Sequence, residues 1–250
     1  MVANSVFLLV LHVLLHPEAP ILIATNLLFV LIGLFVPGVT RILIFRGIRK
    51  MGTSMTATVV NGTPMFATLL AIIFLRERPG LLVLSGIGLI VGGLMALSLR
   101  GEKRSRRQTE LLYPLLASFL FASKDVVARW GLAAAGQPLL SAAITVTTSI
   151  PEVFLIIRYA QGEKFVLPPL RVFLWFVVSG LFTGGAFLFM FLALHMERVS
   201  VVSPIVNSYS VFVLLLTPLM ARRIERVTLR KVVGAIVVVA GVFLISIGRD

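Results

Sequence analysis

The hydrophobic positions of this chain form long runs, and short polar or charged segments separate them. A helix needs about 20 mostly apolar residues to cross the roughly 30 Å hydrocarbon core of a bilayer, because each residue adds about 1.5 Å. We therefore predict an all-α integral membrane protein in which the first run is too short for a full crossing. The runs predict nine membrane helices, at about residues 3–15, 21–40, 53–75, 80–99, 111–133, 138–157, 170–194, 199–220 and 231–248.

The composition supports a membrane protein over a soluble one. Hydrophobic residues make up 58% of the chain and charged residues 13%, whereas a soluble domain has about 45–50% apolar and about 25% charged residues. The chain has no cysteine and three histidines, which excludes disulfides and thiolate sites and leaves too few histidines for a His-based metal site. We predict neither a metal nor a cofactor.

The net charge of +13 would suggest nucleic acid in a soluble protein. Most of the 23 Lys and Arg residues, however, fall in segments that the alternation of spans puts on one face, with the densest charge at 41–52, 100–110 and 222–231. Cytoplasmic loops carry the excess of Lys and Arg. We therefore expect a cytoplasmic basic face, a C-terminus on the opposite side, and no nucleic-acid partner.

An internal repeat is a further signal in the sequence. Its two copies would make residues 1–99 the first repeat, 100–110 a basic linker and 111–248 the second repeat. An odd number of crossings separates each span from its counterpart, which inverts the topology, and inverted repeats are an architecture of secondary transporters. The matching positions are Gly33-Leu34-Phe35 with Gly180-Leu181-Phe182, Glu77-Arg78 with Glu225-Arg226, Gly86 with Gly234, and Gly93 with Gly241.

The repeat resembles the EamA-type repeat of the drug/metabolite transporter superfamily, from about residue 20 to 248. This resemblance implies ten helices in two five-helix repeats and transport of metabolites without ATP. Two features depart from it: span 111–133 has no counterpart, so we expect the first helix to be missing, and the loop charges reverse the family's cytoplasmic C-terminus. The resemblance rests on residues 52–57 (GTSMTA), 64–67 (PMFA), 74–77 (FLRE), Gly86 and Gly93, and on residues 198–204 (RVSVVSP), Pro218, Glu225, Gly234 and Gly241.

Charged residues inside predicted spans are the first candidates for function, because burying a charge in a membrane is costly. Lys124 and Asp125 lie near the centre of span 111–133, and Asp125 shares a helix face with Arg129. Either these residues form a structural ion pair, or they line a cavity and bind a charged solute group or exchange a proton. Glu152 follows Pro151 and either reaches the membrane interface or supplies a second carboxylate to a proton-coupled site.

Polar residues at the centres of spans 53–75 and 199–220 are the second group of candidates. The repeat places these two helices against each other, so their hydroxyls and amides either line a solute cavity or form ordinary interhelical hydrogen bonds. These residues are Asn61, Thr63 and Pro64 in the first span, and Ser203, Pro204, Asn207, Ser208 and Tyr209 in the second.

Residues near the ends of spans suggest structural roles. Glu77 and Glu225 lie at turns between helices, where each would satisfy exposed N–H groups of the helix that follows it or act in gating. Trp130 and Trp175 are expected at the membrane interface as anchors.

No nucleophile, metal or phosphate-loop motif of an enzyme occurs in the sequence. We expect a secondary transporter for small metabolites such as amino acids, an exporter or permease that works by alternating access, with proton coupling left open. The alternative is a non-transporting accessory subunit that handles a lipid-linked substrate. The expected partners are a small solute and the lipid bilayer, the expected location is a prokaryotic plasma membrane, and a homo- or hetero-dimer is allowed.

Overall fold

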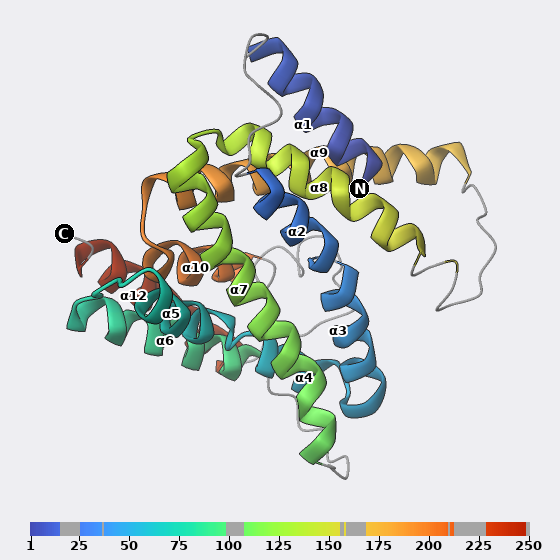
Figure 1. The fold of residues 1–250 in the computed structure, drawn as a ribbon. Helices are drawn as coiled ribbons and strands as arrows, with labels where there is room; N and C mark the ends of the chain where they lie inside the picture. The colour runs from blue at the N-terminus through green and yellow to red at the C-terminus, as the bar shows by residue number, and fades with distance from the viewer. Residues whose placement is uncertain are drawn as a thin grey trace. The chain divides into compact units, whose positions relative to one another are not determined.

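The structure is a computed structural model and describes residues 1–15, 26–36, 38–98, 108–155, 158, 169–209, 211–212 and 229–248 (Figure 1). Every regular element in these ranges is helical, which confirms the predicted all-α class. The helices are α1 (Val2–Leu15), α2 (Asn26–Phe35), α3 (Gly38–Met51), α4 (Thr53–Val60), α5 (Thr63–Phe74), α6 (Leu81–Ser98), a short 3-10 helix η1 (Gln108–Leu111), α7 (Leu112–Ala135), α8 (Pro138–Leu155), α9 (Leu170–Met196), α10 (Val199–Asn207) and α12 (Leu229–Gly248).

Within the described ranges, five helical stretches are long and apolar enough to cross a membrane: Asn26–Met51, Met55–Phe74, Thr109–Ala134, Pro138–Leu155 and Leu170–Met196. Shorter apolar stretches lie on α1, α6 and α12. Many large apolar side chains on these helices are exposed, such as Phe182 on α9, as expected for surfaces that contact lipid. The architecture is that of a multi-pass membrane protein, while the number of crossings stays a prediction.

The segment 41–52, expected as a basic loop, is mostly helical instead. Helix α3 extends to Met51 and places Arg49 and Lys50 in its last turn, where positive charge is favourable beside the exposed carbonyl groups of a helix end. Only Gly52 separates α3 from α4, and its φ of 89° is a backbone conformation that glycine adopts without strain.

Two of the predicted spans contain a break at a corresponding place. Helix α4 ends where Asn61 adopts φ −65° and ψ −8°, and α5 then begins at Thr63 with Pro64 in its first turn. Helix α10 ends in the same way at Ser208, with φ −67° and ψ −6°. The break in each case follows a helix of eight or nine residues. The internal repeat itself stays a prediction.

The described residues form two compact units. The first unit contains residues 1–39 and 127–196, where α1, α2, α8 and α9 pack together. Phe29 on α2 and Phe191 on α9 are fully buried there, with ring centroids 6.0 Å apart. The second unit contains residues 40–126 and 197–250, and its apolar core lies chiefly between α6 and α12.

Helices α6 and α12 lie side by side (Figure 1). Glycine residues form their closest contacts. A Cβ atom at Gly86 would lie 2.7 Å from the carbonyl oxygen of Gly241, and one at Gly93 would lie 2.8 Å from that of Gly234. Since the earlier glycine of one helix meets the later glycine of the other, the two helices run antiparallel. Small residues at such a contact let two membrane helices approach closely.

Several sequence predictions fall outside the described residues. They are most of the basic linker, at 100–107, the end of span 199–220, and the loop that contains Glu225.

Candidate functional site

A buried ion pair lies on helix α7 in the second unit. The ammonium nitrogen Nζ of Lys124 lies 2.7 Å from Oδ1 of Asp125, and the two residues are 8% and 4% exposed. Among the described residues, Lys124 and Asp125 are the buried ones that carry a formal charge.

Ser203 on α10 completes this cluster. Its hydroxyl donates a 2.8 Å hydrogen bond to Oδ2 of Asp125, and Ser203 is 2% exposed. Hydrogen bonds to a carboxylate are stronger than those between neutral groups. The fold thus joins residues from both predicted polar regions, although Ser203 carried no stronger sequence signal than the hydroxyls beside it.

Arg129 does not pair with Asp125, contrary to one of the two expectations. Within the first unit, its guanidinium Nη1 donates hydrogen bonds of 2.8 Å and 2.5 Å to the carbonyl oxygens of Leu194 and His195. These carbonyls lie in the last turn of α9, where the helix has no further N–H groups to offer. Arg129 therefore caps the C-terminus of α9.

Asn61 and Thr63 lie at the break between α4 and α5. The amide Nδ2 of Asn61 donates a 3.2 Å hydrogen bond to the carbonyl of Leu94 on α6, and the hydroxyl of Thr63 donates a 2.6 Å bond to the carbonyl of Val60. Both side chains thus satisfy backbone carbonyls around the break.

Asn207, Ser208 and Tyr209 lie at the end of α10. Asn207 donates to the carbonyl of Ser203 at 2.8 Å, and Ser208 donates to the carbonyl of Ile205 at 2.6 Å. Tyr209 is 60% exposed. Of these three residues, Asn207 is the one that contacts a member of the cluster.

Glu152 on α8 caps the start of α3, at two residues that belong to the first unit as Glu152 does. Its carboxylate accepts hydrogen bonds from the backbone N–H groups of Gly38, at 3.1 Å, and Val39, at 2.7 Å, in the first turn of α3. A carboxylate is favourable at a helix N-terminus because the exposed N–H groups there carry partial positive charge. Neither sequence reading of Glu152, an interfacial group or a second coupling carboxylate, foresaw this contact.

Glu77 also caps a helix, but not the one expected. Its two carboxylate oxygens accept hydrogen bonds from the first turn of α10, whereas the prediction assigned it to the helix that follows it, α6. The predicted chemistry was correct and the predicted partner was wrong. Glu225 lies outside the described residues.

Polar residues of the first unit escaped the sequence reasoning. Asn4, Ser5, His12 and Asn26 are all at most 6% exposed, and the hydroxyls of Ser5 and Thr147 lie 2.6 Å apart. An asparagine, a serine and a histidine within the largely apolar run of α1 were the signal that could have identified this helix as packed against polar partners.

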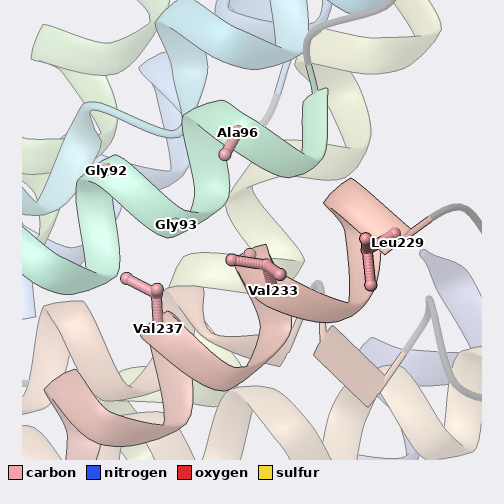
Figure 2. A pocket seen from close by; sticks show the side chains of 7 residues that line it. Gly92, Gly93, Ala96, Leu229, Val233 and Val237 are labelled. Carbon is pink, nitrogen blue, oxygen red and sulfur yellow. The ribbon is translucent and has the colours of Figure 1, made fainter.

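An apolar groove of about 390 Å³ runs between α6 and α12 in the second unit. Figure 2 shows the side chains of Leu229, Val233 and Val237 from α12 facing Gly92, Gly93 and Ala96 of α6. This lining offers no group to recognise a polar solute. No cluster of metal-ligating side chains occurs in the parts of the chain that the structure covers.

The comparisons with known proteins agree with the fold. The sequence matches the EamA-like transporter family over residues 1–99 and 108–247. The fold is similar to that of a crystal structure with a TM-score of 0.81 and 14% sequence identity, over 99% of this chain and 84% of that chain. A search of curated proteins finds no match.

The helices define a multi-pass α-helical membrane protein with a charged pair buried in its interior. The family match covers nearly the whole sequence, and the chain belongs to the EamA-like transporter family. It is therefore a membrane transporter for a small solute, and the resemblance in the sequence to the drug/metabolite transporter superfamily is confirmed.

Proposed function

We propose that this protein is a secondary transporter that moves small zwitterionic metabolites, such as amino acids, by alternating access across a prokaryotic plasma membrane. The observation that carries this proposal is the buried contact of Lys124, Asp125 and Ser203. Charges inside a membrane protein are costly and mark solute or ion pathways.

The ion pair suits a zwitterion because each of its two charges can exchange its present partner for the oppositely charged group of the solute. The ammonium group of an amino acid would replace Lys124 at the Asp125 carboxylate, and the amino acid's carboxylate would replace Asp125 at Lys124. The charge of the site stays constant in this exchange, and each buried ion keeps a counter-charge. A solute with only one charge would leave one member of the pair without that compensation.

The breaks in α4–α5 and α10 support the same assignment. Discontinuous helices are typical of transporter binding sites, because interrupted backbone exposes polar groups inside the membrane. Pro204 in α10 has no N–H group, so the carbonyl of Ser200 receives no helical hydrogen bond from that position. Asn61, Thr63, Asn207, Ser208 and Tyr209 are proposed as further polar groups along the solute path.

Proton coupling is the open part of the proposal, and Asp125 is its candidate group. A carboxylate that loses its ammonium partner when the solute leaves has two routes to neutrality, return of Lys124 or uptake of a proton. The first route gives transport that does not respond to a pH gradient. The second gives transport that a pH gradient accelerates.

Flux in liposomes tests the function directly. Purified protein is reconstituted with a panel of ¹⁴C-labelled amino acids inside, and efflux is followed with and without a pH gradient. We expect efflux from the wild type, loss of most of it in Lys124→Met and Asp125→Asn, and wild-type efflux in the control Glu197→Gln. Unchanged efflux in both cluster variants would overturn the site, and no efflux of any amino acid would overturn the solute class.

A different result would favour the accessory-subunit alternative. That result is a chain that carries none of the panel by itself and forms a stable complex with a second membrane protein in detergent. Flux that appears only in the complex would establish the accessory-subunit function.

A further inference from the structure

The first turn of α10 is held by a carboxylate from a distant part of the chain. Glu77, in the segment between α5 and α6, accepts hydrogen bonds from the backbone N–H groups of Val199, at 2.8 Å, and Ser200, at 3.0 Å. The Ser200 hydroxyl donates a third bond of 2.6 Å to the same carboxylate. All of these residues belong to the second unit.

No side chain of α10 itself caps this end. The N-cap residue is Arg198, which makes no side-chain capping hydrogen bond. The first N–H groups of a helix have no partner within the helix, so an external acceptor must satisfy them. Glu77 is the acceptor that does so for Val199 and Ser200.

The same face of α10 makes a second contact with a carboxylate. Ser200 and Ser203 are three residues apart, a spacing that puts two side chains on one face of a helix. Ser200 donates to Glu77 and Ser203 donates to Asp125. One short helix is therefore attached at two points, first to the segment before α6 and then to the charged cluster on α7.

Helix α10 is short enough to depend on these attachments. It has nine residues and contains Pro204, and isolated helices of this length are marginal because nucleation is costly and few bonds repay it. Residue 203 begins the second turn, three positions after Ser200, the last residue that Glu77 holds. Fraying of the first turn would release the Ser203 hydroxyl from Asp125.

We propose that Glu77 is a positioning residue for the Lys124–Asp125–Ser203 cluster: it fixes the start of α10 and thereby sets Ser203 against Asp125. This inference rests on the proposed function of that cluster. Glu77 itself does not contact the solute in this arrangement and acts through the helix.

Hydrogen exchange of the full-length protein in lipid nanodiscs tests the positioning without any solute. In Glu77→Gln we expect the amides of Ser203, Ile205 and Val206 to exchange about tenfold faster, because a charge-assisted cap is lost. Glu77→Asp keeps the charge and should restore at least half of the protection. Ser200→Ala, which removes one bond of the three, should give a smaller increase and covers the case in which Glu77→Gln fails to fold.

Glu197→Gln is the matched control, since it removes the same charge one residue before Arg198 and does not touch the amides of Val199 or Ser200. Faster exchange that is confined to Val199 and Ser200 in Glu77→Gln would overturn the proposal, because the cap would then act only locally. Equal effects of Glu77→Gln and Glu197→Gln would also overturn it.

Transport supplies a readout that a purely structural cap would not change. For the labelled amino acid with the highest wild-type efflux, Glu77→Gln should raise KM about tenfold with little change in kcat. It should have no further effect in a Ser203→Ala background. Additive effects in the double variant would overturn the route through Ser203. If none of the labelled amino acids shows efflux, the hydrogen-exchange result decides on the positioning role by itself.

Discussion

Two helix contacts in the second unit use opposite means to hold the protein together. Between α6 and α12, glycines meet backbone carbonyls and the surrounding side chains are apolar. Between α7 and α10, a hydroxyl meets a carboxylate that also contacts an ammonium group. The first contact depends on the absence of side-chain atoms, and the second depends on the presence of particular polar atoms.

The difference distinguishes a contact that only supports the fold from one that belongs to the proposed solute site. In lipid, an apolar contact gains little from the hydrophobic effect, so close packing must supply its stability. A charged contact is costly unless each charge keeps its partner. Substitutions that add atoms should therefore damage the first contact, and substitutions that remove a charge should damage the second.

Removal of one charge from the cluster should have the largest effect. Asp125→Asn removes the negative charge that faces Lys124, and we expect a loss of about 3–5 kcal/mol of stability. Thermal unfolding in detergent micelles measures it. The double variant Lys124→Met with Asp125→Leu should recover most of the unfolding temperature without recovering flux, and an Asp125→Asn protein as stable as the wild type would contradict the buried pair.

Addition of atoms to the glycine contact should come next. Gly86→Val places new atoms where a Cβ alone would lie 2.7 Å from the Gly241 carbonyl oxygen, and we expect a loss of about 3 kcal/mol through overpacking. Gly88→Val is the matched control on the same helix, because nothing lies within 4 Å of its Cβ position. Equal unfolding temperatures for the two variants would show that α6 and α12 do not pack through Gly86.

Removal of the hydroxyl of the cluster should cost less than removal of a charge. Ser203→Ala deletes one hydrogen bond to Asp125, and we expect about 1.5–2 kcal/mol of destabilisation together with weaker solute binding. The control Ser246→Ala deletes a hydroxyl that donates only to the Val242 carbonyl of its own helix. Similar losses in both variants would mean that the carboxylate contact adds nothing.

The cap of α3 should show the smallest of these effects. Glu152→Gln replaces the carboxylate that accepts from Gly38 and Val39, and we expect a loss of about 1 kcal/mol. Glu110→Gln, a charge removal in the short helix η1, serves as the control. Flux that collapses in Glu152→Gln while stability is unchanged would instead favour a coupling role for this residue.

Much of the helical fold could be predicted from the sequence because the physical signal is local. The predicted spans at 80–99 and 170–194 agree closely with α6 and α9. The error at 41–52 has the opposite cause, since four basic residues marked a loop although arginine and lysine are also good helix formers. Charge density alone did not distinguish a loop from the end of a long helix.

The same reasoning could predict only part of the candidate site. Lys124 and Asp125 could be chosen because charges stand out in an apolar run, and Ser203 could not be ranked above its neighbours. The sequence likewise identified Glu77 as a helix cap, but it did not identify the helix that Glu77 caps. Ser203 and Asp125 are 78 positions apart, and Glu77 and Val199 are 122 positions apart. No local pattern encodes such contacts.

The sequence by itself determined the membrane class, most helix boundaries and the glycines at Gly86, Gly93, Gly234 and Gly241, because these depend on hydrophobicity and residue size along one segment. Only the tertiary structure decided that Gly86 meets Gly241, that Glu77 holds α10 and that Ser203 binds Asp125. Hydrogen bonds and close contacts act over about 3 Å, so their partners are defined only when the packing of helices has brought distant segments together.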